Sequence, residues 1–67
     1  MNKIIGKNIK TYRMCQNITQ EELASKINID RTTLSHYETG NRLPSILILC
    51  DIADCLHVTL DELVGRY

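Results

Sequence analysis

The sequence predicts a compact all-α fold built from five short helices. The chain has only 67 residues, a size that buries about 60% of its unfolded surface and leaves no room for a barrel or a doubly wound sheet. It contains neither Trp nor Phe, whereas sheets favour aromatic and β-branched residues. Helix-capping motifs and apolar residues at helical spacing recur along it. We therefore expect residues 1–67 to form a single domain.

The first predicted helix covers residues 2–15. Ile5, Ile9 and Tyr12 fall on one face at helical spacing, so they should point into the core. Gly6 lies inside this helix and should weaken it by about 1 kcal/mol relative to alanine.

The second helix begins at a capping box. The Thr19 hydroxyl can accept from the backbone N–H of Glu22, and the Glu22 carboxylate can accept from that of Thr19. Asn28 stands where the helix should end, since asparagine tolerates the left-handed conformation. The buried face of this helix should consist of Leu23, Ala24 and Ile27.

A third helix should follow almost at once. Asp30 is a good N-cap residue, and Gly40 should end the helix in the left-handed conformation. Leu34 and Tyr37 should face inward.

The fourth and fifth helices follow Pro44. The fourth should cover residues 45–56, and the fifth should start at a second capping box, Thr59 to Glu62, and run for about two turns. The core candidates of the fourth helix are Ile46, Leu49, Cys50, Ile52, Ala53 and Leu56.

Charge is unevenly distributed, although the net charge is zero. Residues 1–17 hold four basic and no acidic side chains, while residues 43–67 hold one basic and four acidic side chains. Such polarity suits a domain that presents a positive face to phosphate, and an ordinary solvated surface fits it equally well. We expect Lys7 and Lys10 to form a solvated helix face that attracts anions at long range.

Several functional classes are excluded or disfavoured. The sequence has no phosphate-binding glycine loop, metalloprotease motif or nucleophile elbow, so we expect neither an enzyme nor a cofactor. Cys15, Cys50 and Cys55 lack metal-ligand spacing, so we expect no metal. No apolar run is long enough to span a bilayer and no signal peptide is recognisable. We therefore expect a cytoplasmic protein without membrane contact or a small-molecule ligand.

The segment from Thr19 to Gly40 is the most informative part of the chain. It places two short helices around a tight break, as in the helix-turn-helix motif that lays its second helix in the DNA major groove. Together with its surroundings it resembles the lambda-repressor-like (Cro/cI-type, XRE) helix-turn-helix family over nearly the whole chain. The residues that carry the resemblance are Ile5–Lys10, Arg13, Thr19–Ala24, Leu34-Ser35, Tyr37–Gly40, Arg42, Pro44-Ser45, Ile52-Ala53, Leu56 and Asp61–Leu63.

The resemblance implies a five-helix domain that binds operator DNA, usually as a symmetric homodimer. By position, Arg31, Thr32 and His36 would contact base edges, and Gln20, Thr39, Asn41 and Arg42 would contact phosphates. Gln20 could also brace the third helix. The chemistry suits most of these roles. The Arg31 guanidinium matches guanine O6 and N7, and Thr32 offers a hydroxyl and a methyl group to a base edge.

The resemblance also implies a structural ion pair. In the family, the positions of Arg13 and Glu38 tie the first helix to the end of the third. Arginine suits this role because it stays charged and binds a carboxylate through two nitrogens.

One departure from the family pattern points to a partner surface. Leu47 and Ile48 are apolar where the family is usually polar, and with Val64 and Tyr67 they could extend a homodimer contact; scattered surface residues are the alternative. The sequence thus predicts a transcriptional repressor that binds a palindromic operator. The alternative function is a protein-interaction module, such as an antitoxin or anti-regulator, whose apolar fourth helix binds a partner protein.

Overall fold

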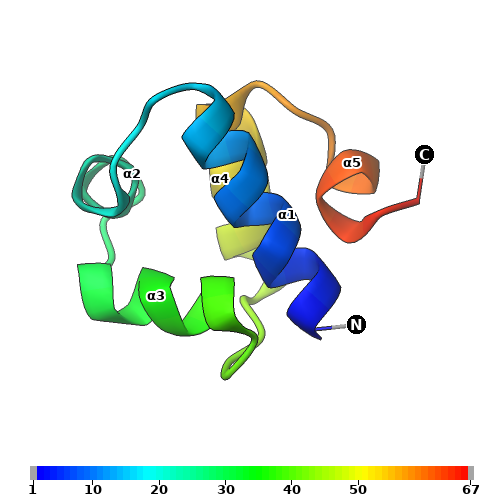
Figure 1. The fold of residues 1–67 in the computed structure, drawn as a ribbon, viewed down its shortest axis with the longest axis horizontal. Helices are drawn as coiled ribbons and strands as arrows, with labels where there is room; N and C mark the ends of the chain where they lie inside the picture. The colour runs from blue at the N-terminus through cyan, green and yellow to red at the C-terminus, as the bar shows by residue number, and fades with distance from the viewer. Residues whose placement is uncertain (1, 67) are drawn as a thin grey trace.

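The computed structural model describes residues 2–66, which form five helices without a strand (Figure 1). This confirms the all-α fold. The helices are α1 (Asn2–Cys15), α2 (Gln20–Lys26), α3 (Arg31–Thr39), α4 (Ile46–Leu56) and α5 (Leu60–Val64). Tyr67 lies outside the described residues.

The first helix holds the bundle together. α1 packs against α3, α4 and α5, while α2 packs against α3 and α4. In Figure 1, α2 and α3 lie on one side of α1 and α5 lies on the other, with α4 behind. The Asn8 amide donates to the carbonyl oxygen of Leu63 at 2.9 Å, which fastens α5 to α1.

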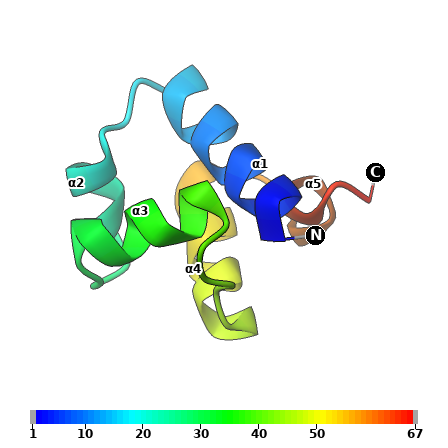
Figure 2. The same ribbon diagram turned by 60° about the horizontal axis from the view of Figure 1, so that its bottom comes forward.

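One core cluster receives apolar side chains from all five helices, as the helical spacing predicts. Its largest fully buried members are Ile9, Leu23, Leu34, Ile52, Leu56 and Leu63. The prediction that Ile46 joins this core is wrong, because its side chain is 64% exposed. Ile46 is the first residue of α4, whose first turn extends past the neighbouring helices (Figure 2).

The helix ends follow the predicted capping chemistry with one exception. Both capping boxes are present, with Thr19 paired to Glu22 and Thr59 paired to Glu62. Gly40 ends α3 in the left-handed conformation. Asp30 does occupy the N-cap position of α3, but its side chain makes no capping hydrogen bond, contrary to the prediction.

Gly6 marks the closest approach of α1 to α3. A Cβ atom at this position would lie 2.7 Å from the carbonyl oxygen of Glu38 and would also overlap the carbonyl oxygen of Tyr37. Both atoms belong to the backbone and cannot rotate away. The glycine that lowers the helix propensity of α1 is therefore what allows the two helices to touch.

No helix within residues 2–66 is both long and apolar enough to cross a membrane. The three cysteines are free: Cys15 is exposed, and Cys50 and Cys55 are half-buried. Across the same residues, the His, Cys, Asp and Glu side chains form no group that could hold a metal ion.

Candidate nucleic-acid interface

α2 and α3 form a tight helix-turn-helix unit. Asn28, with φ of 63°, turns the chain after α2 in the left-handed conformation that the sequence predicts. The backbone N–H of Ile29 then donates to the carbonyl oxygen of Ala24 at 2.9 Å, which closes the turn. Asp30 is extended, and α3 begins at Arg31. The break covers residues 27–30, so the start of α3 closely follows the end of α2.

α3 has one buried and one exposed side. Leu34 and Glu38 are buried, whereas Arg31 and Thr32 are exposed and His36 is half-exposed. Of the base-contact residues that the sequence predicts, Thr32 and His36 are four positions apart, so they lie on one face of the helix. Arg31 stands at the exposed N-terminal end.

The loop after α3 is organised by a single carbonyl group. The carbonyl oxygen of His36 accepts from the backbone N–H groups of Asn41 at 2.9 Å and Arg42 at 3.2 Å. It also accepts from the Thr39 hydroxyl at 3.2 Å. The side chains of Thr39, Asn41 and Arg42 are exposed. The loop thus holds one cation and two polar groups together at the C-terminal end of α3.

A buried ion pair joins α1 to α3. Arg13 Nε donates to Glu38 Oε2 at 2.7 Å, and Arg13 Nη2 donates to Glu38 Oε1 at 3.2 Å. Arg13 Nη1 donates to the carbonyl oxygen of Ile18 at 2.7 Å. Both side chains are at least nine-tenths buried. Three of the five guanidinium N–H groups are therefore used, which offsets the loss of hydration that burial imposes.

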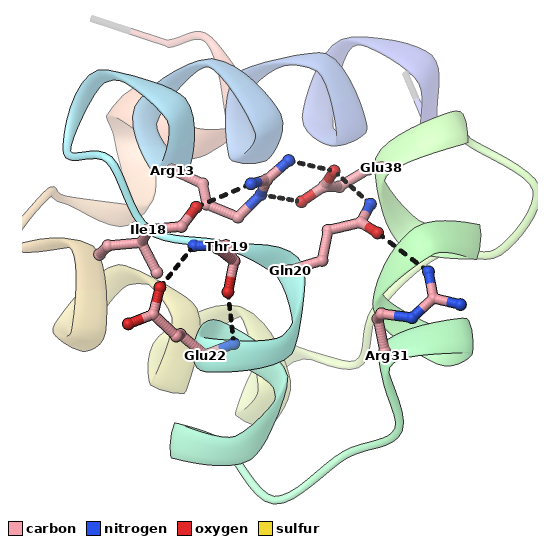
Figure 3. A network of polar contacts seen from close by, with 7 residues as sticks. All are labelled: Arg13, Ile18, Thr19, Gln20, Glu22, Arg31 and Glu38. Carbon is pink, nitrogen blue, oxygen red and sulfur yellow. Dashed lines mark hydrogen bonds and ion pairs between the residues drawn. The ribbon is translucent and has the colours of Figure 1, made fainter.

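Gln20 links this ion pair to the surface of α3 (Figure 3). Its Nε2 donates to Glu38 Oε1 at 2.9 Å, and its Oε1 accepts from Arg31 Nη1 at 3.4 Å. The charge of Glu38 sets the orientation of the amide, because only the nitrogen can donate to a carboxylate. The oxygen consequently faces Arg31 and gives its guanidinium an anchor.

The contact between Gln20 and Glu38 was missed in the sequence, where the two residues stand 18 positions apart without a pattern that relates them. The resemblance implies that Gln20 contacts a phosphate and braces the third helix, but it does not name Glu38 as the partner. With its oxygen facing Arg31, the amide has one N–H left for a phosphate.

The surface residues expected to extend a dimer contact are only partly exposed. Leu47 is 73% exposed, but Ile48 and Val64 are half-buried and pack against the core. Leu43 and Ile46 are exposed beside Leu47, and the sequence analysis did not single them out as surface residues. We call Leu43, Ile46 and Leu47 the α4 patch.

Known proteins resemble this chain over almost its full length. A family model described as helix-turn-helix matches residues 9–63. The chain is 41% identical over 61 residues to the uncharacterized HTH-type transcriptional regulator YazB of Bacillus subtilis, covering 91% of this chain and 88% of that protein. It is 38% identical over 63 residues to the cryptic phage CTXphi transcriptional repressor RstR of Vibrio cholerae, covering 94% of this chain but 56% of that protein.

A solved structure supports the same assignment. The restriction-modification controller protein C.AhdI from Aeromonas hydrophila superposes with a TM-score of 0.86 at 26% sequence identity, over 91% of this chain and 92% of that one. This chain belongs to the lambda-repressor-like helix-turn-helix family of transcriptional regulators, which confirms the resemblance.

Proposed function

We propose that this protein regulates transcription by binding double-stranded DNA at specific sequences, with α3 in the major groove. The observation that carries the proposal is the exposed side of α3, where Thr32 and His36 lie opposite the buried Leu34 and Glu38 and Arg31 is exposed at the N-terminal end. Relatives that cover almost the whole chain are named as transcriptional regulators. The protein would act by occupancy of its site, as a repressor, and without catalysis.

Base recognition is assigned to three side chains. The planar guanidinium group of Arg31 would donate to guanine O6 and N7. Its hydrogen bond to Gln20 limits the directions in which this group can point. Thr32 offers a hydroxyl and a methyl group, and His36 can donate or accept at a base edge one turn further along α3.

Phosphate binding is assigned to both ends of the helix-turn-helix unit. Gln20 would donate its remaining N–H to one strand. Thr39, Asn41 and Arg42 would meet the other strand from the loop whose backbone is fixed on His36. Contacts to phosphates place a protein on the duplex without reading its sequence.

We further propose that two copies bind together, with the α4 patch at their contact. Leu43, Ile46 and Leu47 are each more than half exposed; Leu43 lies in the loop before α4, and the other two are its first residues. An exposed apolar cluster of this kind marks an interaction surface. A symmetric pair would read two half-sites about 10–10.5 base pairs apart, or a multiple of that distance.

Selection of binding sites from a random duplex library tests the proposal, repeated at two salt concentrations because phosphate contacts weaken as salt rises. An enriched palindrome is the expected result. Enrichment of a single half-site would contradict the proposed binding as two copies, but it would leave sequence-specific DNA binding standing. Absence of enrichment at low salt would overturn the proposal and favour the protein-interaction function, which has the weaker support because the relatives above are named as regulators of transcription.

A further inference from the structure

α1 carries a row of lysines that the proposed function does not use. Lys3, Lys7 and Lys10 are all exposed and follow one another at i, i+4 and i+7, so they lie on one face of the helix. Within residues 2–66 the single ion pair joins Arg13 to Glu38, so no described carboxylate pairs with any of the three lysines. The row is a concentrated positive charge that has no ion-pair partner among the described residues.

The row lies on the α3 side of α1, away from the core. Ile5 and Ile9 are buried in the core, and Gly6 touches the backbone of α3. At about 100° per residue, the order around the helix is core, then Gly6, then the lysines. The lysines therefore lie on the solvent side of α1, next to the side that packs against α3.

The row begins at the loop assigned to phosphate binding. A Cβ atom at Gly40 would lie 2.9 Å from Lys3 Cγ and 3.1 Å from Lys3 Cα, so the start of α1 lies against the end of α3. Gly40 is followed directly by Asn41 and Arg42. Figure 1 shows the N-terminal turn of α1 beside this loop. Lysines and loop thus form one continuous surface.

We propose that this lysine row binds the phosphate backbone of the same DNA and lengthens the contact that the loop after α3 begins. The inference rests on the proposed function. Successive lysines are separated by about 6 and 4.5 Å along the helix axis, and their long side chains can each reach a different phosphate. Attraction at a distance acts mainly on the association rate, whereas each direct phosphate contact also adds a full step to the dependence of equilibrium affinity on salt.

The test compares two double variants that lose the same charge. Lys7→Gln/Lys10→Gln shortens the row, and Lys26→Gln/Arg66→Gln removes two exposed cations, one at the end of α2 and one two residues after α5. Affinity for a selected site and for a scrambled duplex is measured between 50 and 200 mM salt. If the row variant has lost two phosphate contacts, its affinity depends less on salt. Between 50 and 200 mM salt, the affinity of the wild type should then fall by a factor about tenfold larger than the affinity of the row variant.

The row variant should also lose affinity equally on the selected and scrambled duplexes, because phosphates carry no sequence. Lys7→Arg/Lys10→Arg, which keeps both charges, should retain the wild-type salt dependence. An unchanged salt dependence in the row variant, or an equal change in both neutralised variants, would overturn the inference. Failure of the wild-type protein to bind either duplex would instead remove the proposed function on which the inference rests.

Discussion

At the scale of single residues, Glu38 joins three helices. Its carboxylate accepts from Arg13 of α1 and Gln20 of α2 while lying on α3. Glu38→Ala should therefore leave a buried arginine charge unpaired and cost roughly 3–5 kcal/mol, close to all that so small a core supplies. Chemical unfolding measures the loss, with exposed Glu21→Ala as the control. A loss below about 1 kcal/mol would contradict the structural role given to the pair.

Arg31 and Arg42 are both exposed, but we propose a base contact for Arg31 and a phosphate contact for Arg42. Arg31→Ala should cost about 1–3 kcal/mol and relax sequence preference at one position, because it removes a base contact. Arg42→Ala should weaken binding to all sequences alike and lower the salt slope by about one, because it removes a phosphate contact. Affinities for single-base variants of the selected site distinguish the two patterns, and the same pattern for both arginines would refute the assignment.

Among the helices, the contact between α1 and α3 depends on Gly6. In an isolated helix, Gly6→Ala would stabilise α1 by about 1 kcal/mol. In the folded protein the new methyl group would meet the Glu38 and Tyr37 carbonyl oxygens, so the helices must separate, at a typical cost of 1–3 kcal/mol for an overpacked site. Thermal unfolding should show a lower midpoint for Gly6→Ala, and no loss for the exposed Thr11→Ala in the same helix.

The start of α2 makes stability depend on pH. Hydrogen bonds from the backbone N–H of Thr19 and then from its hydroxyl hold the pKa of Glu22 below its ordinary value. A lowered carboxyl pKa stabilises the fold at neutral pH, and this contribution disappears as pH falls through the lowered pKa.

Glu22→Gln should accordingly unfold at a lower urea concentration than the wild type at pH 7, and the difference should shrink at pH 3. Glu21→Gln, one residue away and without the cap, is the matched control. A difference that stays constant with pH would contradict the role of the charged cap.

At the scale of the whole molecule, we expect two copies to meet through the α4 patch. Ile46→Glu/Leu47→Glu should keep the fold, since both side chains are more than half exposed, and should shift sedimentation toward the monomer mass. Ile4→Glu, exposed on α1, controls for adding acidic charge at an apolar surface position. If the double variant still sediments with the mass of two copies, the contact between the copies lies outside the α4 patch.

Local sequence was sufficient for most of the fold. Thr19, Asn28, Gly40 and Thr59 predict helix ends because a cap is decided within a few residues of the chain. Helical spacing predicts most of the core for the same reason. It fails at Ile46, where burial depends on how far α4 extends past its neighbours.

Local patterns were enough to predict the five helices, most of their caps, the helix-turn-helix and the family, because each depends on neighbours in the chain or on a long motif. The partner of Gln20 and the role of Gly6 became visible only in the packed fold. Gln20 donates to Glu38, and Gly6 lies against the backbone of α3; both contacts join segments that are distant in the sequence. Such contacts arise from the packing of whole helices, and no short-range pattern encodes the angle at which two helices meet.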